Sequence, residues 1–269
     1  MTTMWRFVAL FVALVAGVGV AVWYYRAPGD DGRPVRVVAR NDDGWLDALL
    51  SRSPKDVEAA TAELEQRGTA ALPVIRRTLQ NQGAQPAQRK AALKAAAILG
   101  ARATEAIADV TDALNDPGYA PEAALALSFM GAPAVTPLRE ALQSENPVVR
   151  REALRAMGKL RERASIDPQI VIPVLLQSLD DTDPSVRNVA VNYLGIVRDS
   201  PEKEVTGLIK ALSDESSEVR QAAAAALAEY GTLAEPAIPA LKKAANDPDD
   251  EVKREAGRTL VRLAELKQK

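Results

Sequence analysis

The chain has 269 residues, of which 47% are hydrophobic, 26% charged and 4% aromatic, the profile of a globular protein rather than a disordered one. It contains no histidine and no cysteine, which excludes Ser-His-Asp triads, HExxH zinc proteases and metal sites built on histidine or thiolate ligands. With 34 Lys and Arg against 36 Asp and Glu, the net charge is −2, and this balance argues against a nucleic-acid-binding protein.

The first 26 residues predict a membrane anchor. Phe7 to Tyr25 is a run of 19 residues without a charged side chain. At about 1.5 Å per residue, a helix of this length crosses the roughly 30 Å hydrocarbon core of a bilayer. Trp5 precedes the run and Trp-Tyr-Tyr closes it, where a membrane interface favours aromatic side chains. We therefore expect a single transmembrane helix that holds the protein in the membrane through Phe7 to Tyr25.

Two properties of this segment stay open. Gly19-Val20-Ala21 loosely fits a cleavage site, and a cleaved signal peptide would leave a secreted domain. Four arginines follow the run and Arg6 precedes it, so the positive-inside rule places the following domain in the cytoplasm. A short tail with one arginine is also typical of an anchor that delivers its domain outside. Residues 27–43, rich in Gly, Pro, Asp and Arg, are expected to form a flexible juxtamembrane linker.

The rest of the chain repeats a helical segment. The copies VRREALRAMGKL, VRNVAVNYLGIV, VRQAAAAALAEY and VKREAGRTLVRL begin at residues 149, 186, 219 and 252, and three weaker copies begin at 56, 88 and 119. The fifth residue of every copy is alanine, and four positions later stands Leu, Met or Ala. This spacing predicts one buried helix face. The alanine predicts close packing of neighbouring helices, because a larger side chain would overpack the interface.

A second set of amphipathic helices alternates with the first. These helices are expected at 70–79, 104–114, 134–142, 169–179, 204–212 and 236–244, with prolines near their starts at 73, 137, 173 and 239. A capping residue followed by proline predicts the starts of first helices at 53–54, 116–117, 146–147, 183–184 and 247–248. Glycines 68, 100, 131 and 231 predict the ends of first helices. The pattern predicts an all-α chain of helix pairs that stack into a solenoid.

These units resemble HEAT repeats, specifically the short HEAT-like repeat first associated with phycobilisome lyase subunits. The resemblance rests on the motif V-R-x-x-A-x-x-A-[LM]-G, spelled VRREALRAMG at 149–158 and recurring from Val186. An Asp in the preceding turn and an x-x-P-x-L second helix accompany it. The resemblance covers roughly residues 44–266, and we expect residues 44–269 to form a solenoid of about six to seven repeats. It implies a right-handed α-solenoid in which first helices form the convex side and second helices the concave side.

One equivalent position in four copies is basic: Arg150, Arg187, Arg220 and Lys253. We call these residues the basic ladder. The ladder either binds an anionic partner or pairs with carboxylates of the turns, such as Asp183, Asp214 or Asp247. We favour the structural pairing, because a planar guanidinium at a fixed repeat position suits two-pronged pairing with a carboxylate.

The second helices carry the candidate partner-binding residues: Arg76, Arg77, Arg139, Gln143, Gln177, Lys210 and Lys242. They predict a mixed surface with some basic bias, and the alternative is an ordinary solvated helix face. A longer interval places about four extra residues at Lys159–Gln169, which predicts either a binding loop or a drifted turn. Tyr193 replaces the alanine of other copies and is expected in the core or as an exposed aromatic contact.

No catalytic constellation emerges. Acidic pairs such as Asp109 and Asp112 are typical of solvated helix faces rather than acid–base dyads, and no Gly-rich phosphate loop is present. We therefore expect no catalytic residue, metal or cofactor. The sequence predicts a monomeric, membrane-tethered scaffold or adaptor that binds a protein partner through the concave surface, and no nucleic acid. The alternatives are an accessory subunit resembling bilin lyases and a nucleic-acid-binding HEAT-like protein.

Overall fold

The computed structural model describes residues 22–25, 35–38, 44–164 and 166–267. The chain divides into two compact units, Met1–Gln66 and Arg67–Lys269. In the first unit, strand β1 (Val22–Tyr25) pairs antiparallel with β2 (Val35–Val38), with Val22 opposite Val38. Helices α1 (Gly44–Ala48) and α2 (Pro54–Arg67) follow, and Trp45 of α1 is buried.

The predicted transmembrane helix falls largely on residues 7–21, which lie outside the described residues, so the anchor stays a prediction. Its last four residues, 22–25, form β1 instead of a helix. The sequence Val-Trp-Tyr-Tyr suits a strand, since β-branched and aromatic side chains fit a pleated surface. Strand β2 lies within the expected linker. Among the described helices, none is both long enough and apolar enough to cross a bilayer.

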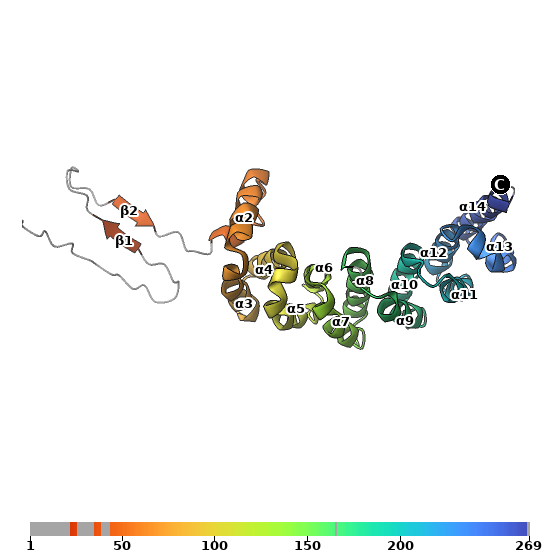
Figure 1. Ribbon diagram of the computed structural model, residues 1–269, viewed down its shortest axis with the longest axis horizontal. Helices are drawn as coiled ribbons and strands as arrows, with labels where there is room; N and C mark the ends of the chain where they lie inside the picture. The colour runs from red at the N-terminus through yellow and green to blue at the C-terminus, as the bar shows by residue number, and fades with distance from the viewer. Residues whose placement is uncertain (1–21, 26–34, 39–43, 165, 268–269) are drawn as a thin grey trace, which may run out of the picture. The chain divides into compact units, whose positions relative to one another are not determined.

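The second unit consists of helices in two layers (Figure 1). First helices contact one another along one layer: α4 (Pro86–Leu99), α6 (Ala120–Met130), α8 (Pro147–Ala164), α10 (Pro184–Val197), α12 (Ser217–Ala228) and α14 (Asp250–Lys267). Each of these helices packs against a second helix of the other layer: α3 (Leu72–Gln80), α5 (Ile107–Leu114), α7 (Val135–Ala141), α9 (Pro168–Ser178), α11 (Pro201–Ala211) and α13 (Ile238–Ala244).

Short 3-10 helices join several pairs: η1 (Gly68–Ala71), η2 (Gly100–Ala106), η3 (Ala132–Ala134) and η4 (Gly231–Ala237). The four glycines predicted to close first helices, at 68, 100, 131 and 231, all have positive φ, between 55° and 80°. This prediction is confirmed, because only glycine enters that region without steric cost. At the end of α10 the same turn is made by Arg198, with φ 47°.

The alanine at the fifth position of each copy lies in the core. All seven alanines are at most 3% exposed: Ala60, Ala92, Ala123, Ala153, Ala190, Ala223 and Ala256. The first helices of the second unit therefore pack through a row of small side chains. Their close approach is visible where α8 meets α10, because a Cβ on Gly158 would stand 2.2 Å from the ring of Tyr193. Tyr193 is half-buried in this contact, between the two expected positions of a core residue and an exposed aromatic.

Two expected starts of first helices are wrong, and one proline of a second helix is misplaced. Helix α6 begins at Ala120 and α14 at Asp250, so Pro117 and Pro248 lie in the preceding turns rather than at the first helical position. Pro173 lies inside α9 instead of near its start. The helix itself begins within one residue of the expected position, where the carboxylate of Asp167 accepts a hydrogen bond from the backbone N–H of Gln169.

The extra residues at Lys159–Gln169 mainly lengthen α8, which runs to Ala164, so neither a drifted turn nor a binding loop describes most of them. Side chains of the added turn contact two neighbouring segments, α6 and the residues after α10. Arg161 donates two hydrogen bonds of 2.9 Å to Asp199, after α10. Arg163 donates to the Ser128 hydroxyl at 2.8 Å, and its guanidinium lies 4.1 Å from the ring centre of Phe129, both in α6.

Candidate partner-binding surface

The turns between repeats share one conformation. In seven turns of the described residues, a side-chain oxygen accepts the backbone N–H two residues later: Ser51, Asn81, Asp116, Ser144, Asp181, Asp214 and Asp247. Asp, Asn and Ser all close such a turn because each carries a short side-chain acceptor. Sequence reasoning missed this regularity, although a polar residue two positions after the last leucine of most second helices is visible in the chain.

Three residues of the basic ladder each hold an aspartate of the following turn. Arg150 donates to Asp181 at 2.8 and 2.7 Å, Arg187 to Asp214 at 2.8 Å twice, and Arg220 to Asp247 at 2.8 Å twice. The Nη1 group of each arginine donates to a carbonyl of the preceding turn. Each guanidinium therefore ties two successive turns together. Asp183, which we expected to pair, instead accepts hydrogen bonds from Ser185 at the start of α10.

These contacts lower the pKa values of the three aspartates. Burial alone would raise the pKa of Asp181 and Asp214, but the hydrogen bonds from Arg150 and Arg187 hold both pKa values below the ordinary range. The hydrogen bond from Arg220 likewise lowers the pKa of Asp247. The three arginines are thus engaged in the fold rather than available to an anionic partner.

The ladder differs at its two ends. Lys253 donates to Asp250 of its own helix, because no repeat follows α14 in the described chain. Arg89 occupies the equivalent position in the copy from Gln88, which sequence reasoning overlooked. Its guanidinium lies 4.9 Å from the ring centre of Tyr119 and donates to the carbonyl of Leu79. A cation–π contact therefore replaces the carboxylate pair at this interface.

Arg76, the first of the candidate partner-binding residues, forms an ion pair within the protein. Its Nε donates to Asp109 of α5 at 2.7 Å, and Gln80 of α3 donates to the other oxygen of Asp109 at 2.7 Å. Asp109 is 8% exposed. This carboxylate is therefore held by two donors that stand four residues apart on the neighbouring second helix.

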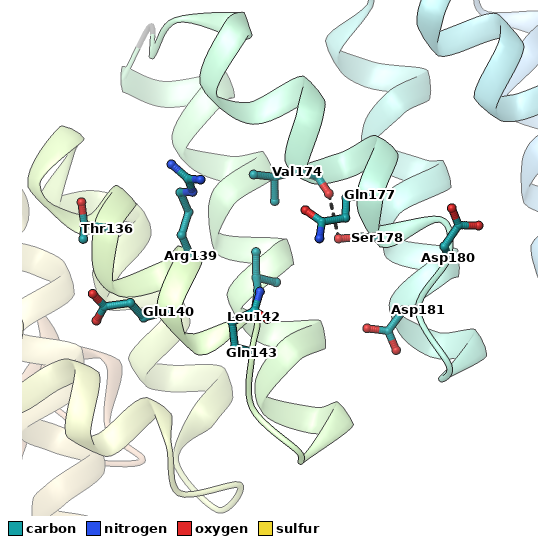
Figure 2. Close-up of a pocket in the computed structure, with 10 residues that line it drawn as sticks. All are labelled: Thr136, Arg139, Glu140, Leu142, Gln143, Val174, Gln177, Ser178, Asp180 and Asp181. Carbon is teal, nitrogen blue, oxygen red and sulfur yellow. Dashed lines mark hydrogen bonds between the residues drawn. The ribbon is translucent and has the colours of Figure 1, made fainter.

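A hollow of about 580 Å³ lies between α7 and α9 and brings three candidate residues together (Figure 2). Arg139 and Gln143 line it from α7 and the turn that follows, and Gln177 lines it from α9. All three are exposed. Leu142 and Val174 add apolar surface to the lining. The carboxylates of Glu140, Asp180 and Asp181 also line it, and Asp181 is paired with Arg150 and Asp180 with Lys210. This α7/α9 hollow therefore combines hydrogen-bond donors, acidic groups and some apolar surface, as binding sites for polypeptides commonly do.

The remaining candidates lie elsewhere. Arg76 and Arg77 line a second hollow beside α3. Lys210 of α11 forms an ion pair with Asp180, which follows α9, and lines a hollow between these helices. Lys242 is exposed on α13. The structure therefore gathers Arg139, Gln143 and Gln177 at one place and distributes the other four over the second-helix layer.

One buried acidic group belongs to the fold. Glu204 is 0% exposed, and its carboxylate accepts backbone N–H groups of Asp199 and Ser200 at 3.2 Å. Tyr230 lies 3.1 Å from the second oxygen and donates to the carbonyl of Leu194. Burial raises the pKa of Glu204. Among the described residues, no group of His, Cys, Asp or Glu side chains could hold a metal ion.

The comparisons with known proteins agree on the fold. Residues 172–261 match the family model of HEAT repeats. Residues 124–206 match the model of subunit 1 of the non-SMC mitotic condensation complex. The two matches overlap. The chain contains HEAT-like repeats. Among curated proteins, no sequence matches this chain.

Solved structures show the same architecture at low sequence identity. Kap95p in complex with RanGDP matches with a TM-score of 0.60 and 17% identity over 80% of this chain and 32% of Kap95p. Kap121p bound to RanGTP matches with a TM-score of 0.59 and 17% identity over 83% of this chain and 28% of Kap121p. The chain thus spans about a third or less of the length of these proteins. The CpcE and CpcF complex of phycocyanin lyase from Nostoc sp. PCC7120 gives a TM-score of 0.49 at 24% identity, over 58% of this chain and 98% of that chain.

Proposed function

We propose that this protein is a non-enzymatic scaffold that binds a protein partner through its second-helix layer and is held at a membrane by residues 7–25. The observation that carries the proposal is the α7/α9 hollow, where Arg139, Gln143 and Gln177 are exposed. In the first-helix layer, the repeated alanines and the arginines of the basic ladder make contacts between repeats. The second-helix layer therefore offers the donors that the fold leaves available.

The fold supports this proposal in a general way. Solenoids of stacked helix pairs present a long surface for their mass and act by binding. The structures of Kap95p and Kap121p are complexes with RanGDP and RanGTP, so proteins with this architecture bind protein partners. Such analogy concerns the fold alone, and the choice of surface here rests on the side chains of α7 and α9.

The test is site-specific photocrosslinking in native membranes with the full-length chain. A photoreactive amino acid at Gln177, on the second-helix layer, is expected to trap one partner protein reproducibly. The matched control carries the same group at Asn192, which is exposed on α10 of the first-helix layer. The proposal predicts a crosslink to that partner from position 177 and none from position 192. Equal crosslinking from both positions would refute the choice of surface.

The membrane part of the proposal has a separate test. The run of uncharged residues from Phe7 to Tyr25 predicts that the chain stays in the membrane fraction through high-salt and carbonate washing, because salt releases only electrostatic attachment. Arginine at both Leu10 and Leu14 should abolish insertion, since each charge near the centre of the span costs about 2.5–3.5 kcal/mol. A mature N-terminus at Val22 would instead show signal cleavage and a secreted domain.

A further inference from the structure

Two of the second helices carry an arginine in the same register, and each arginine is followed four residues later by a glutamine. Arg76 follows the buried Ile75 of α3, and Arg139 follows the buried Leu138 of α7. The two glutamines are Gln80 and Gln143. Residues four apart on a helix lie on the same face, and Gln80 is the last residue of α3. Gln143 stands in the turn just after α7, and both it and Arg139 line the same hollow.

In the first of these places the acceptor is present. Asp109 stands one position before the buried Val110 of α5, and its two oxygens receive Arg76 and Gln80 at 2.7 Å each. Arginine and glutamine on one second helix thus clamp a carboxylate that the next second helix supplies. A charge-assisted hydrogen bond of this kind is stronger than one between neutral groups.

In the second place the acceptor is missing. The residue of α9 that corresponds to Asp109 is Val174, one position before the buried Leu175. Within the described part of the chain, Arg139 has no ion-pair partner and the side chain of Gln143 has no hydrogen bond. Both residues line the α7/α9 hollow, as does Val174, and Gln177 lines it from α9 (Figure 2). The hollow therefore has the donors of the clamp and room where its carboxylate would stand.

We propose that Arg139 and Gln143 form a clamp for a carboxylate of the partner protein, and that the partner inserts an aspartate or glutamate side chain from an extended segment into the α7/α9 hollow. This inference rests on the proposed scaffold function and names the chemistry of the partner at that surface. Apolar residues on either side of the acidic one meet Leu142 and Val174. The geometry of Arg76, Gln80 and Asp109 shows the bound state within the same chain.

The direct test is isothermal titration calorimetry on the full-length protein with the acetylated and amidated peptide Gly-Leu-Asp-Leu-Gly. We expect saturable binding below 1 mM and at least tenfold weaker binding of the peptide with Asn in place of Asp. Arg139→Gln should weaken binding of the acidic peptide at least tenfold, and Gln143→Leu should weaken it severalfold. Absence of saturable binding below 1 mM, or equal affinity for the Asn peptide, would overturn the proposal.

The sharpest variant restores the missing carboxylate. Val174→Asp places an internal acceptor where Asp109 stands in the occupied clamp, so it should abolish peptide binding while circular dichroism shows the helices intact. Val174→Asn is the matched control, because it is polar but uncharged and should retain at least half of the affinity. Arg76→Gln should leave peptide binding unchanged, since that clamp is already filled. Binding that survives Val174→Asp would overturn the proposal.

A final arm separates two sources of carboxylate. The Asn peptide with a free C-terminus carries only its terminal carboxylate, and binding equal to that of the acidic peptide would overturn the assignment to a side chain. The photocrosslinking at position 177 tests the scaffold function separately from the carboxylate clamp. If that position traps a partner but the acidic peptide does not bind, the scaffold function stands and the carboxylate clamp alone fails.

Discussion

The two ends of the second unit hold their repeats together by different means. From α8 to α14, three arginines each clamp an aspartate of the following turn, and the exposure of these charged side chains is 14% or less. From α3 to α7, Arg89 lies over Tyr119, and the next ladder position is the buried Ala120. The turns themselves have the same conformation in both regions.

This difference separates two tasks of the aspartates. Asn81 and Ser144 close their turns as well as Asp181 does, so the turn needs only a short acceptor side chain. The negative charge is needed for the contact with the next repeat. Since stability in solenoids is roughly a sum of repeats and interfaces, we expect the region from α8 to α14 to open less often than the region from α3 to α7.

The largest effect is expected from removing one clamp. Arg187→Ala leaves Asp214 partly buried without its counter-charge and should destabilise the fold by about 3 kcal/mol. Arg89→Ala removes a cation–π contact and should cost about 1 kcal/mol. Urea unfolding followed by circular dichroism, with hydrogen exchange to locate the opening, measures both. Equal losses would show that the two regions do not differ as argued.

The row of alanines offers a control that both regions share. Ala92 and Ala190 are both fully buried at the fifth position of their copies. Leucine at either position must push neighbouring first helices apart, and overpacking of this kind costs about 1–3 kcal/mol. We expect similar losses for Ala92→Leu and Ala190→Leu, with Lys242→Ala within about 0.5 kcal/mol of the wild type. Unfolding midpoints of the three variants decide this, and a neutral Ala190→Leu would contradict the packing.

Acid should destabilise the region from α8 to α14 more than the region from α3 to α7. The pKa of Asp214 is lowered in the fold, so its contribution to stability is present above the unfolded pKa of about 3.9 and is lost as pH falls through the folded value. Asp214→Asn keeps an acceptor for the turn but has no charge to lose. Urea midpoints measured from pH 6 to pH 2.5 should therefore fall less steeply for Asp214→Asn than for the wild type. Parallel curves would argue against the clamp.

Much of this arrangement could be predicted from the sequence. The row of alanines and the four closing glycines could be predicted because each depends on local sterics, that is, on the size of one side chain or the backbone angle of one residue. The pairing of Arg187 and Arg220 with turn aspartates was also expected. The α7/α9 hollow was not, because it depends on which residue of α9 faces Arg139. The extra turn of α8 escaped prediction too, since its side chains contact α6 and the segment after α10, which are distant in the sequence.

A smaller effect is expected at the buried carboxyl group of Glu204. Because burial raises its pKa, its favourable contribution is complete below the unfolded pKa of about 4.3 and is lost as pH rises through the folded value. In Glu204→Gln, the amide oxygen accepts the N–H groups of Asp199 and Ser200, and the amide nitrogen donates to Tyr230. We expect Glu204→Gln to be more stable by about 1 kcal/mol at pH 7 and equal to the wild type near pH 4. Chemical denaturation at both pH values measures this, and a less stable glutamine variant at pH 7 would contradict it.

The smallest effect concerns Arg198, which stands at the end of α10 where four other first helices are closed by a glycine. Its φ of 47° costs a residue with a Cβ about 1 kcal/mol relative to glycine. The side chain also donates to the carbonyl of Glu229 at 2.7 Å. Arg198→Gly and Arg198→Ala both lose that hydrogen bond, but only glycine relieves the backbone. We therefore expect the glycine variant to be more stable than the alanine variant by about 0.5–1 kcal/mol, read from their unfolding midpoints. An alanine variant as stable as the glycine variant would show that the backbone at this turn carries no strain.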